Sequence, residues 1–220
     1  MKKIFKILSI GLMATMIITA FAGCGNKTGG DVPLVTPQIE GKTGEDLVKC
    51  MEVTAGDKTI TVPFTISNLE SLGFKLGTGN SADVKVEADG LSSGNVVFKN
   101  ETGDIIVALA RNETGSETTL PNCTAFNVST SSSNVMINGI TCGKSTYADV
   151  LAKLGKDINE RADTFEAEKE RISKENDDFF FLNLSYSYPV SENDETIIYS
   201  MICDIDADTG TVSNVTISKN

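Results

Sequence analysis

GKSTYADVLAKLG (143–155) carries the clearest local structure in the chain. Four large apolar residues recur here at positions i, i+3, i+4 and i+7, which is the spacing of one helix face: Tyr147, Val150, Leu151 and Leu154. Thr146 is a suitable N-cap, and Gly155 suits the end of the last turn. This segment predicts a short amphipathic helix that packs on a larger apolar surface.

The pattern L-x-x-L-G occurs twice, at residues 69–73 and 151–155. Thr65 and Gly73 could bound the first of these helices as N-cap and C′ residues. Similar elements surround both copies, so we predict an α+β fold of antiparallel sheet with one short helix per unit. The tandem repeat of hairpin, helix and meander would occupy two units, residues 46–120 and 121–220.

Strand predictions rest on alternating apolar residues bounded by turn residues. Residues 51–54 and 59–62 predict a first hairpin, and 124–129 with 134–138 predict a second one around a serine-rich turn. Residues 104–110 are apolar on both faces and predict a strand buried on both sides. The other predicted strands are 84–88, 95–99, 182–188, 197–205 and 212–218.

Phe21-Ala22-Gly23-Cys24 resembles a bacterial lipobox. Lys2, Lys3 and Lys6 precede an apolar run, residues 7–22, that is short for a membrane span of about 20 residues. The resemblance implies that residues 1–23 are a cleaved signal peptide and that Cys24 carries a diacylglyceryl lipid. The alternative is a retained transmembrane anchor. Residues 24–45, with Cys24 and many Gly and Pro residues, would form a flexible tether on the extracytoplasmic face of the cell membrane.

The body resembles Gram-positive lipoproteins with an uncharacterised extracellular region. Residues 143–155 are also similar to the T-x-x-x-V-x-x-x-L-G helix of the fold class of the β-lactamase-inhibitor protein and the outer-membrane-assembly lipoprotein. The resemblance covers about Met51 to Ile217. It implies protein binding and not catalysis, and it names no partner.

Composition excludes several functions. The chain has 30 acidic and 19 basic residues, a net charge of -11, no His and no Trp. It should repel nucleic acid, and it lacks the histidine of Ser-His-Asp, Cys-His and His-zinc sites. We predict a non-enzymatic lipoprotein that binds the membrane through Cys24 and an extracellular protein or polymer through its body, without a cofactor. The alternative is a carboxylate-dependent hydrolase or a calcium-binding module.

Two acidic segments need a separate interpretation. Asp204, Asp206 and Asp208 alternate as calcium ligands do, but Gly210 comes one residue late and Val215 occupies the position of the closing glutamate. A hairpin turn is therefore the preferred interpretation and a calcium site the weaker one. Residues 163–178 predict a solvated helix or loop, with a partner-binding face as the alternative. The glutamates of this predicted solvated face are Glu166, Glu168, Glu170 and Glu175.

The body contains four cysteines without a C-x-x-C spacing, which disfavours zinc and thioredoxin-like chemistry. If Ser132 and Ser133 form the tip of the second hairpin, Cys123 and Cys142 lie opposite each other near its base. Cys50 and Cys203 then remain as a second pair by elimination. Free buried thiols are the alternative to these two disulfides.

Overall fold

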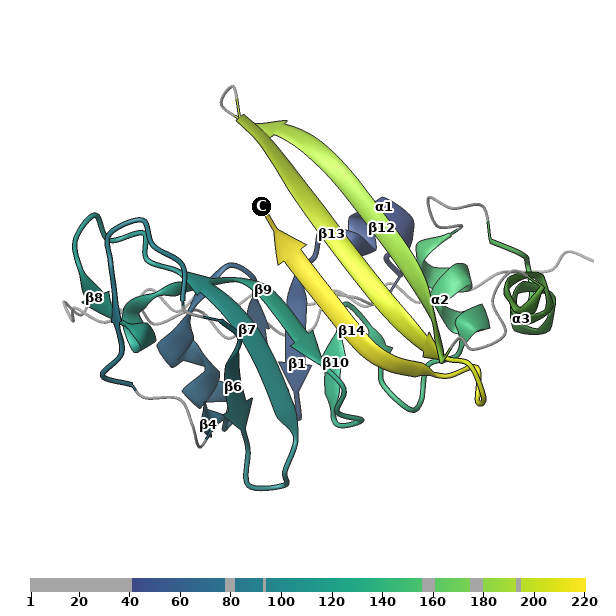
Figure 1. Ribbon diagram of the computed structural model, residues 1–220, viewed down its shortest axis with the longest axis horizontal. Helices are drawn as coiled ribbons and strands as arrows, with labels where there is room; N and C mark the ends of the chain where they lie inside the picture. The colour runs from purple at the N-terminus through teal and green to yellow at the C-terminus, as the bar shows by residue number, and fades with distance from the viewer. Residues whose placement is uncertain (1–40, 78–81, 93, 156–160, 175–179, 193–194) are drawn as a thin grey trace, which may run out of the picture. The chain divides into compact units, whose positions relative to one another are not determined.

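A computed structural model describes residues 41–77, 82–92, 94–155, 161–174, 180–192 and 195–220 (Figure 1). These residues belong to one compact unit. The predicted signal peptide, the lipobox with Cys24 and most of the predicted tether lie outside the described residues, as does Glu175. Among the described residues, no helix is long and apolar enough to cross a membrane.

Two hairpins build a four-stranded antiparallel sheet, sheet A, in the order β11-β10-β1-β2. Val53 of β1 pairs with Ile137 of β10, and this pairing joins the hairpins. Asn138 and Gly139 connect β10 to β11 with φ angles of 47° and 76°, as a two-residue hairpin turn of the primed type requires. The strands are β1 (Glu52–Ala55), β2 (Lys58–Thr61), β10 (Val135–Ile137) and β11 (Ile140–Thr141).

The structure confirms the first predicted hairpin and corrects the second. Residues 124–129 and 134–138 do form strands, but β9 (Thr124–Thr130) lies in the other sheet and does not pair with β10. Residues 131–134 instead carry the chain from one sheet to the other. Ser132 Oγ accepts a hydrogen bond from Ile105 N at 2.7 Å, which holds this crossing on the larger sheet. The Asn-Gly turn was therefore a better hairpin marker than the serine-rich segment.

The larger sheet, sheet B, is antiparallel and has eight strands. Seven follow the order β12-β13-β14-β9-β7-β6-β4, and β3 also pairs with β9. β5 (Lys85–Val86) is much shorter than predicted and pairs with β8 (Thr118–Thr119) in a separate two-stranded sheet. Besides β9, sheet B contains β3 (Phe64–Thr65), β4 (Lys75–Leu76), β6 (Val96–Lys99), β7 (Ile105–Arg111), β12 (Phe181–Glu192), β13 (Glu195–Asp206) and β14 (Val212–Lys219).

The helices are short. α2 (Tyr147–Leu154) has the predicted cap, a capping box between Thr146 and Asp149. η1 (Ile66–Leu72) is a 3-10 helix that ends at Gly73 with φ 84°, while the side chain of Thr65 makes no cap bond. α1 (Gly44–Val48) begins inside the range assigned to the tether. The other described helices are η2 (Leu120–Asn122) and α3 (Phe165–Ser173).

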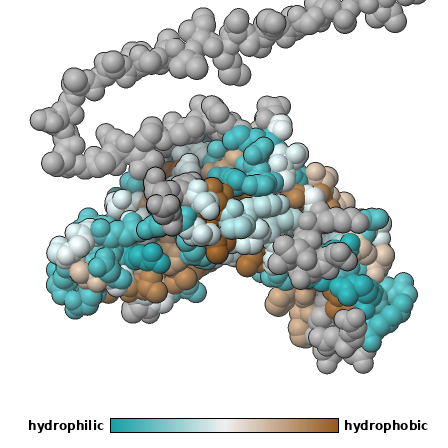
Figure 2. Space-filling view, turned by 90° about the horizontal axis from the view of Figure 1, so that it is seen from above, coloured by the Kyte–Doolittle hydropathy of each residue, from teal (hydrophilic) through white to brown (hydrophobic). Residues whose placement is uncertain are grey.

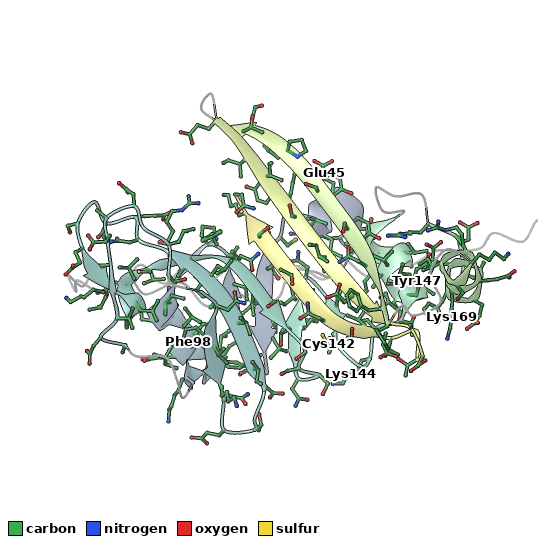
Figure 3. The ribbon with its side chains drawn as sticks, in the orientation of Figure 1. Glu45, Phe98, Cys142, Lys144, Tyr147 and Lys169 are labelled. Carbon is green, nitrogen blue, oxygen red and sulfur yellow. The ribbon has the colours of Figure 1, made fainter. Side chains whose placement is uncertain are left out.

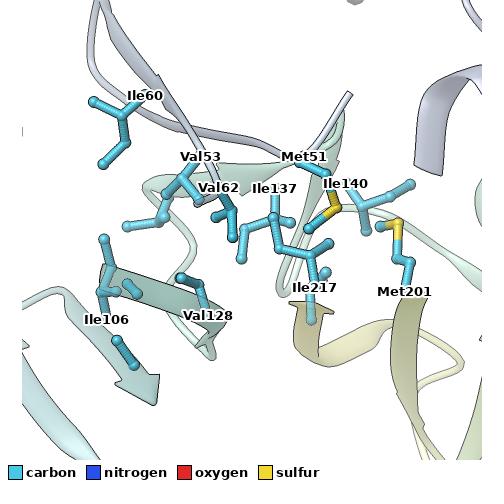
Figure 4. Packing of buried hydrophobic residues seen from close by; sticks show 14 of the residues in the cluster. Met51, Val53, Ile60, Val62, Ile106, Val128, Ile137, Ile140, Met201 and Ile217 are labelled. Carbon is cyan, nitrogen blue, oxygen red and sulfur yellow. The ribbon is translucent and has the colours of Figure 1, made fainter. Parts of the chain in front are cut away.

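One apolar core lies between the two sheets (Figure 4). Val53 and Ile137 of sheet A are fully buried, as are Ile106 and Ile217 of sheet B. Burying one such side chain contributes about 1.5–3 kcal/mol. Strands from both halves of the sequence share this core, so the structure is an α+β protein with a single continuous interior.

Candidate interaction surface

Sheet B has one covered and one uncovered face. Met201, Cys203 and Ile205 of β13 are buried against the core, and the intervening Ser200, Ile202 and Asp204 point to the other side. In Figure 1 the helices α1 and α2 lie behind β12 and β13, while the front of the sheet carries no described element. We call this front surface the open face. Figure 2 shows hydrophilic and hydrophobic patches side by side on one face of the molecule.

Strand register aligns the side chains of the open face into rows. One row contains Ser187, Ser200, Ser218 and Asn127, which are paired from strand to strand. A second row contains Ser185, Ile202, Thr216 and Ser129. Six of these eight side chains are hydroxyls, of which Ser218 is buried; one is an amide, one is the aliphatic Ile202, and none is charged. A chain with a net charge of -11 thus has an uncharged surface over four neighbouring strands.

Asp204 brings a negative charge next to the second row, two residues along β13 from Ile202. Its Oδ1 accepts a hydrogen bond from Asn183 at 3.0 Å, and its Oδ2 accepts one from Asn214 at 3.1 Å. Both amides come from the neighbouring strands β12 and β14. The carboxylate is therefore part of a cross-strand network on the open face.

Beyond β9 the open face becomes apolar. Val107 pairs with Ser129 and also with Val97 of β6, and Leu109 pairs with Asn127. These three aliphatic side chains are half-buried. The guanidinium of Arg111 lies 5.0 Å from the ring centre of Phe126 on the adjacent strand. The open face therefore combines a polar half with a flat aliphatic half.

β12 forms one edge of sheet B, and two features limit pairing along it. Ile198 of β13 exchanges both backbone hydrogen bonds with Asn220, so Pro189, which lies opposite Ile198, points its backbone away from β13. Proline has no N–H to offer to another strand. Arg161 donates to the carbonyl of Asn183 at 2.9 Å and occupies a second position of this edge.

α3 is a mostly exposed helix, as predicted for residues 163–178, but Glu168 does not belong to its solvated face. Glu166 and Glu170 are exposed, but Glu168 is fully buried and forms ion pairs with Arg161 at 3.1 Å and Arg171 at 2.7 Å. Although burial opposes ionisation, hydrogen bonds from Arg171, Ala162 N and Arg161 lower the pKa of Glu168 to about 2. In Figure 3 the labels Tyr147 and Lys169 mark the places of α2 and α3.

The alternating aspartates have separate roles. Asp206 Oδ1 accepts hydrogen bonds from the backbone N–H groups of Asp208 and Thr209 at 3.1 and 2.8 Å, and these bonds lower the pKa of Asp206. This is turn chemistry, as the spacing of Gly210 suggested. In the described ranges, no three His, Cys, Asp or Glu side chains are grouped so that they could hold a metal ion.

All four described cysteines are free thiols. The predicted disulfide between Cys123 and Cys142 assumed that the second hairpin forms. Because this hairpin does not form, the geometric argument for both predicted disulfides no longer holds. Cys142 donates to Thr130 O at 3.3 Å, and burial raises the pKa of its thiol to about 11. Burial also raises the pKa values of Cys123 and Cys203. These three thiols are therefore poorly ionised at neutral pH.

A hollow of about 600 Å³ lies beside the end of η1 and the turn between β6 and β7. Glu70, Lys75 and Glu101 line it together with Phe74. Sequence spacing could not select these two glutamates, because they are 31 residues apart and the sheet brings them to one hollow.

The fold and this surface define an α+β protein of two packed antiparallel sheets with one open sheet face. No protein-family model matches the chain, and comparisons with curated proteins and with solved structures gave no significant match.

Proposed function

We propose that this chain is a lipid-anchored extracytoplasmic lipoprotein that binds a protein or polymer partner through the open face and is not an enzyme. The observation that carries the proposal is the pair of uncharged hydroxyl and amide rows on β12, β13, β14 and β9. Such side chains can hydrogen-bond a partner without the desolvation cost of a charge. The aliphatic half formed by Val97, Val107 and Leu109 would add apolar contact area.

The size of the open face suits a macromolecular partner. The open face crosses six strands, from β12 to β6, which at about 4.8 Å per strand spacing is about 24 Å between the outer two. A standard protein–protein interface buries about 800 Å² on each partner. A patch of that area is about as wide as the open face. The lipid on Cys24 and the tether predicted from composition would hold this face close to the membrane.

The tandem repeat is part of the same proposal. Two observations support it: each half contributes one hairpin to sheet A, and each L-x-x-L-G segment ends a helix. The halves would have diverged in the helix, which is 3-10 in η1 and α-helical in α2.

Site-specific photo-crosslinking in cells tests the proposal. A photoreactive amino acid at Thr216 or Ser200 should give a discrete adduct with the partner, because both positions lie within the rows. The matched control is Asp57, which is exposed in the turn between β1 and β2. Adducts at Asp57 alone, or no adduct at either row position, would contradict binding through the open face.

The hydrolase alternative can be tested at the hollow beside η1. Glu70 and Glu101 line the same hollow, and paired carboxylates can carry general acid and base catalysis. Turnover of an envelope polymer that is abolished by both Glu70→Gln and Glu101→Gln would favour this alternative.

A further inference from the structure

A lysine and a cysteine are hydrogen-bonded to each other where the chain enters α1. Lys42 Nζ donates a hydrogen bond to Cys50 Sγ at 3.2 Å, and Cys50 Sγ donates to Asp46 O at 3.1 Å. Cys50 is partly exposed, whereas the other three described cysteines are buried. Cysteines that react with oxidants are accessible and lie beside a positive charge, and among the described cysteines Cys50 meets both conditions.

The pairing is set by the fold and not by sequence proximity. Lys49 directly precedes Cys50, but its ammonium forms an ion pair with Glu45 on the preceding turn of α1. Lys42 is eight residues from Cys50 and contacts its sulfur. We call the two residues the Lys42–Cys50 pair.

Glu52 supplies a third group. Its side chain is only 7% exposed, and within the described part of the chain its Oε2 has no hydrogen-bond partner. Burial raises the pKa of this carboxyl, while the nearby charge of Lys42 lowers it. The backbone of Glu52 is fixed by Asn138, whose Oδ1 accepts from Glu52 N at 2.8 Å. Lys42 and Glu52 therefore interact through their charges, and the hydrogen bond to Cys50 raises the pKa of Lys42.

We propose that the Lys42–Cys50 pair is a modification site, at which a peroxide converts the hydrogen-bonded side chains into a covalent, reversible sulfenamide cross-link. The Cys50 thiolate attacks hydrogen peroxide, so that an S–O bond forms, the O–O bond breaks and hydroxide leaves. The hydroxide released in this step takes a proton from the Lys42 ammonium, and the amine nitrogen then attacks the sulfenic sulfur. The S–N bond forms as the S–O bond breaks, and the departing hydroxide takes the proton that the nitrogen loses.

The overall step balances. One thiol, one amine and one hydrogen peroxide give one S–N bond and two water molecules. Sulfur is oxidised by two electrons, and the two peroxide oxygens are reduced. The cross-link closes a ring from Lys42 to Cys50 that encloses all of α1, and it protects Cys50 from irreversible oxidation to sulfinic acid.

Peptide mapping of the full-length chain tests the proposal. After treatment with hydrogen peroxide and digestion with trypsin, the peptide that contains Lys42 should be joined to the peptide that begins at Cys50. The joined species should be lighter than the sum of its parts by two hydrogens, and a thiol reductant should release both parts. Cleavage after Lys42 should fail while the cross-link is present.

Two variants make the test specific. Lys42→Arg keeps the positive charge but lacks a nucleophilic amine, so it should give no cross-link and more sulfinic acid at Cys50. Lys49→Arg is the matched control and should cross-link as the unchanged chain does. Sulfinic acid at Cys50 with normal cleavage after Lys42, or an equal yield of cross-link in Lys42→Arg, would overturn the proposal.

Discussion

Phe165 of α3 packs directly on Gly210, the last residue of the turn before β14. A Cβ atom at position 210 would lie 2.9 Å from Cδ1 of Phe165, and Gly210 has a φ angle of 69°. Two independent requirements, open space and a left-handed backbone, therefore select glycine at this position.

Gly210→Ala should lower the free energy of unfolding by about 2–4 kcal/mol, which combines about 1 kcal/mol of backbone strain with the cost of displacing Phe165. Urea unfolding monitored by circular dichroism measures this loss. The matched control is Gly115→Ala, because Gly115 has a φ angle of 74° but a Cβ added there would meet no atom within 4 Å. Equal losses of unfolding free energy in the two variants would show that Phe165 contributes nothing to the cost of Gly210→Ala.

Glu168 should make the free energy of unfolding depend on pH in the acidic range. Its pKa in the folded protein is about 2, below the usual value of 4.5, so its contribution is complete above pH 4.5 and is lost as the pH falls towards 2. Glu168→Gln should cost about 3 kcal/mol near neutral pH, since Arg161 and Arg171 lose their buried partner. Between pH 4.5 and pH 2, the free energy of unfolding of the Glu168→Gln variant should also fall less than that of the unchanged chain. Glu170→Gln removes an exposed pair with Lys174, which water and salt screen, and should leave the free energy of unfolding nearly unchanged.

The capping box of α2 predicts a smaller effect. Thr146 Oγ1 accepts from Asp149 N at 3.2 Å, and Thr146→Ala should cost about 1 kcal/mol in thermal or urea unfolding. Thr65→Ala at the start of η1 is the control, because the Thr65 side chain makes no cap bond. A Thr65→Ala loss as large as that of Thr146→Ala would argue against the cap as the cause.

Pro189 should keep the β12 edge from pairing with other chains. Pro189→Val restores a backbone N–H on the free edge, so size-exclusion chromatography with light scattering should show dimers or larger species at lower protein concentration. Ser187→Val adds the same side chain on β12 and retains Pro189, so it separates the effect of the backbone from that of hydrophobicity. Association of both variants to the same extent would contradict the role of Pro189.

The anchor is tested independently of the fold. Cys24→Ala should abolish labelling by a palmitate analogue and leave the chain unprocessed, because lipid attachment precedes cleavage in the lipoprotein pathway that the lipobox implies. Electrophoretic mobility and metabolic labelling measure both effects. A labelled or shortened Cys24→Ala chain would contradict the lipobox interpretation.

Local structure was largely predictable from the sequence. The α2 helix, its Thr146 cap and most strands of sheet B follow from apolar spacing, which is set by residues a few positions apart. The α+β class follows from the same patterns. The positive φ of Gly73 was also predictable, since few residues other than glycine end a helix in this conformation.

Long-range placement was not predictable. Periodicity gives β9 and β10 as strands but does not say that one joins sheet B and the other sheet A. The burial of Glu168 depends on Arg161 and Arg171 converging on it, and their charges alone would suit a solvated helix equally well. The rows of the open face depend on register, which pairs Thr216 with Ser129 across 87 positions of sequence.

β9 has a consequence for the order in which the chain can fold. It pairs with β7 on one side and with β14, the last strand, on the other. β1 likewise cannot pair with β10 until a much later part of the chain is present, because the paired residues Val53 and Ile137 are 84 positions apart. Such non-local pairings slow folding, and a chain that emerges from its N-terminus first would keep the β14-facing edge of β9 unpaired until the end. Truncation before Val212 would remove β14 and divide sheet B between β13 and β9.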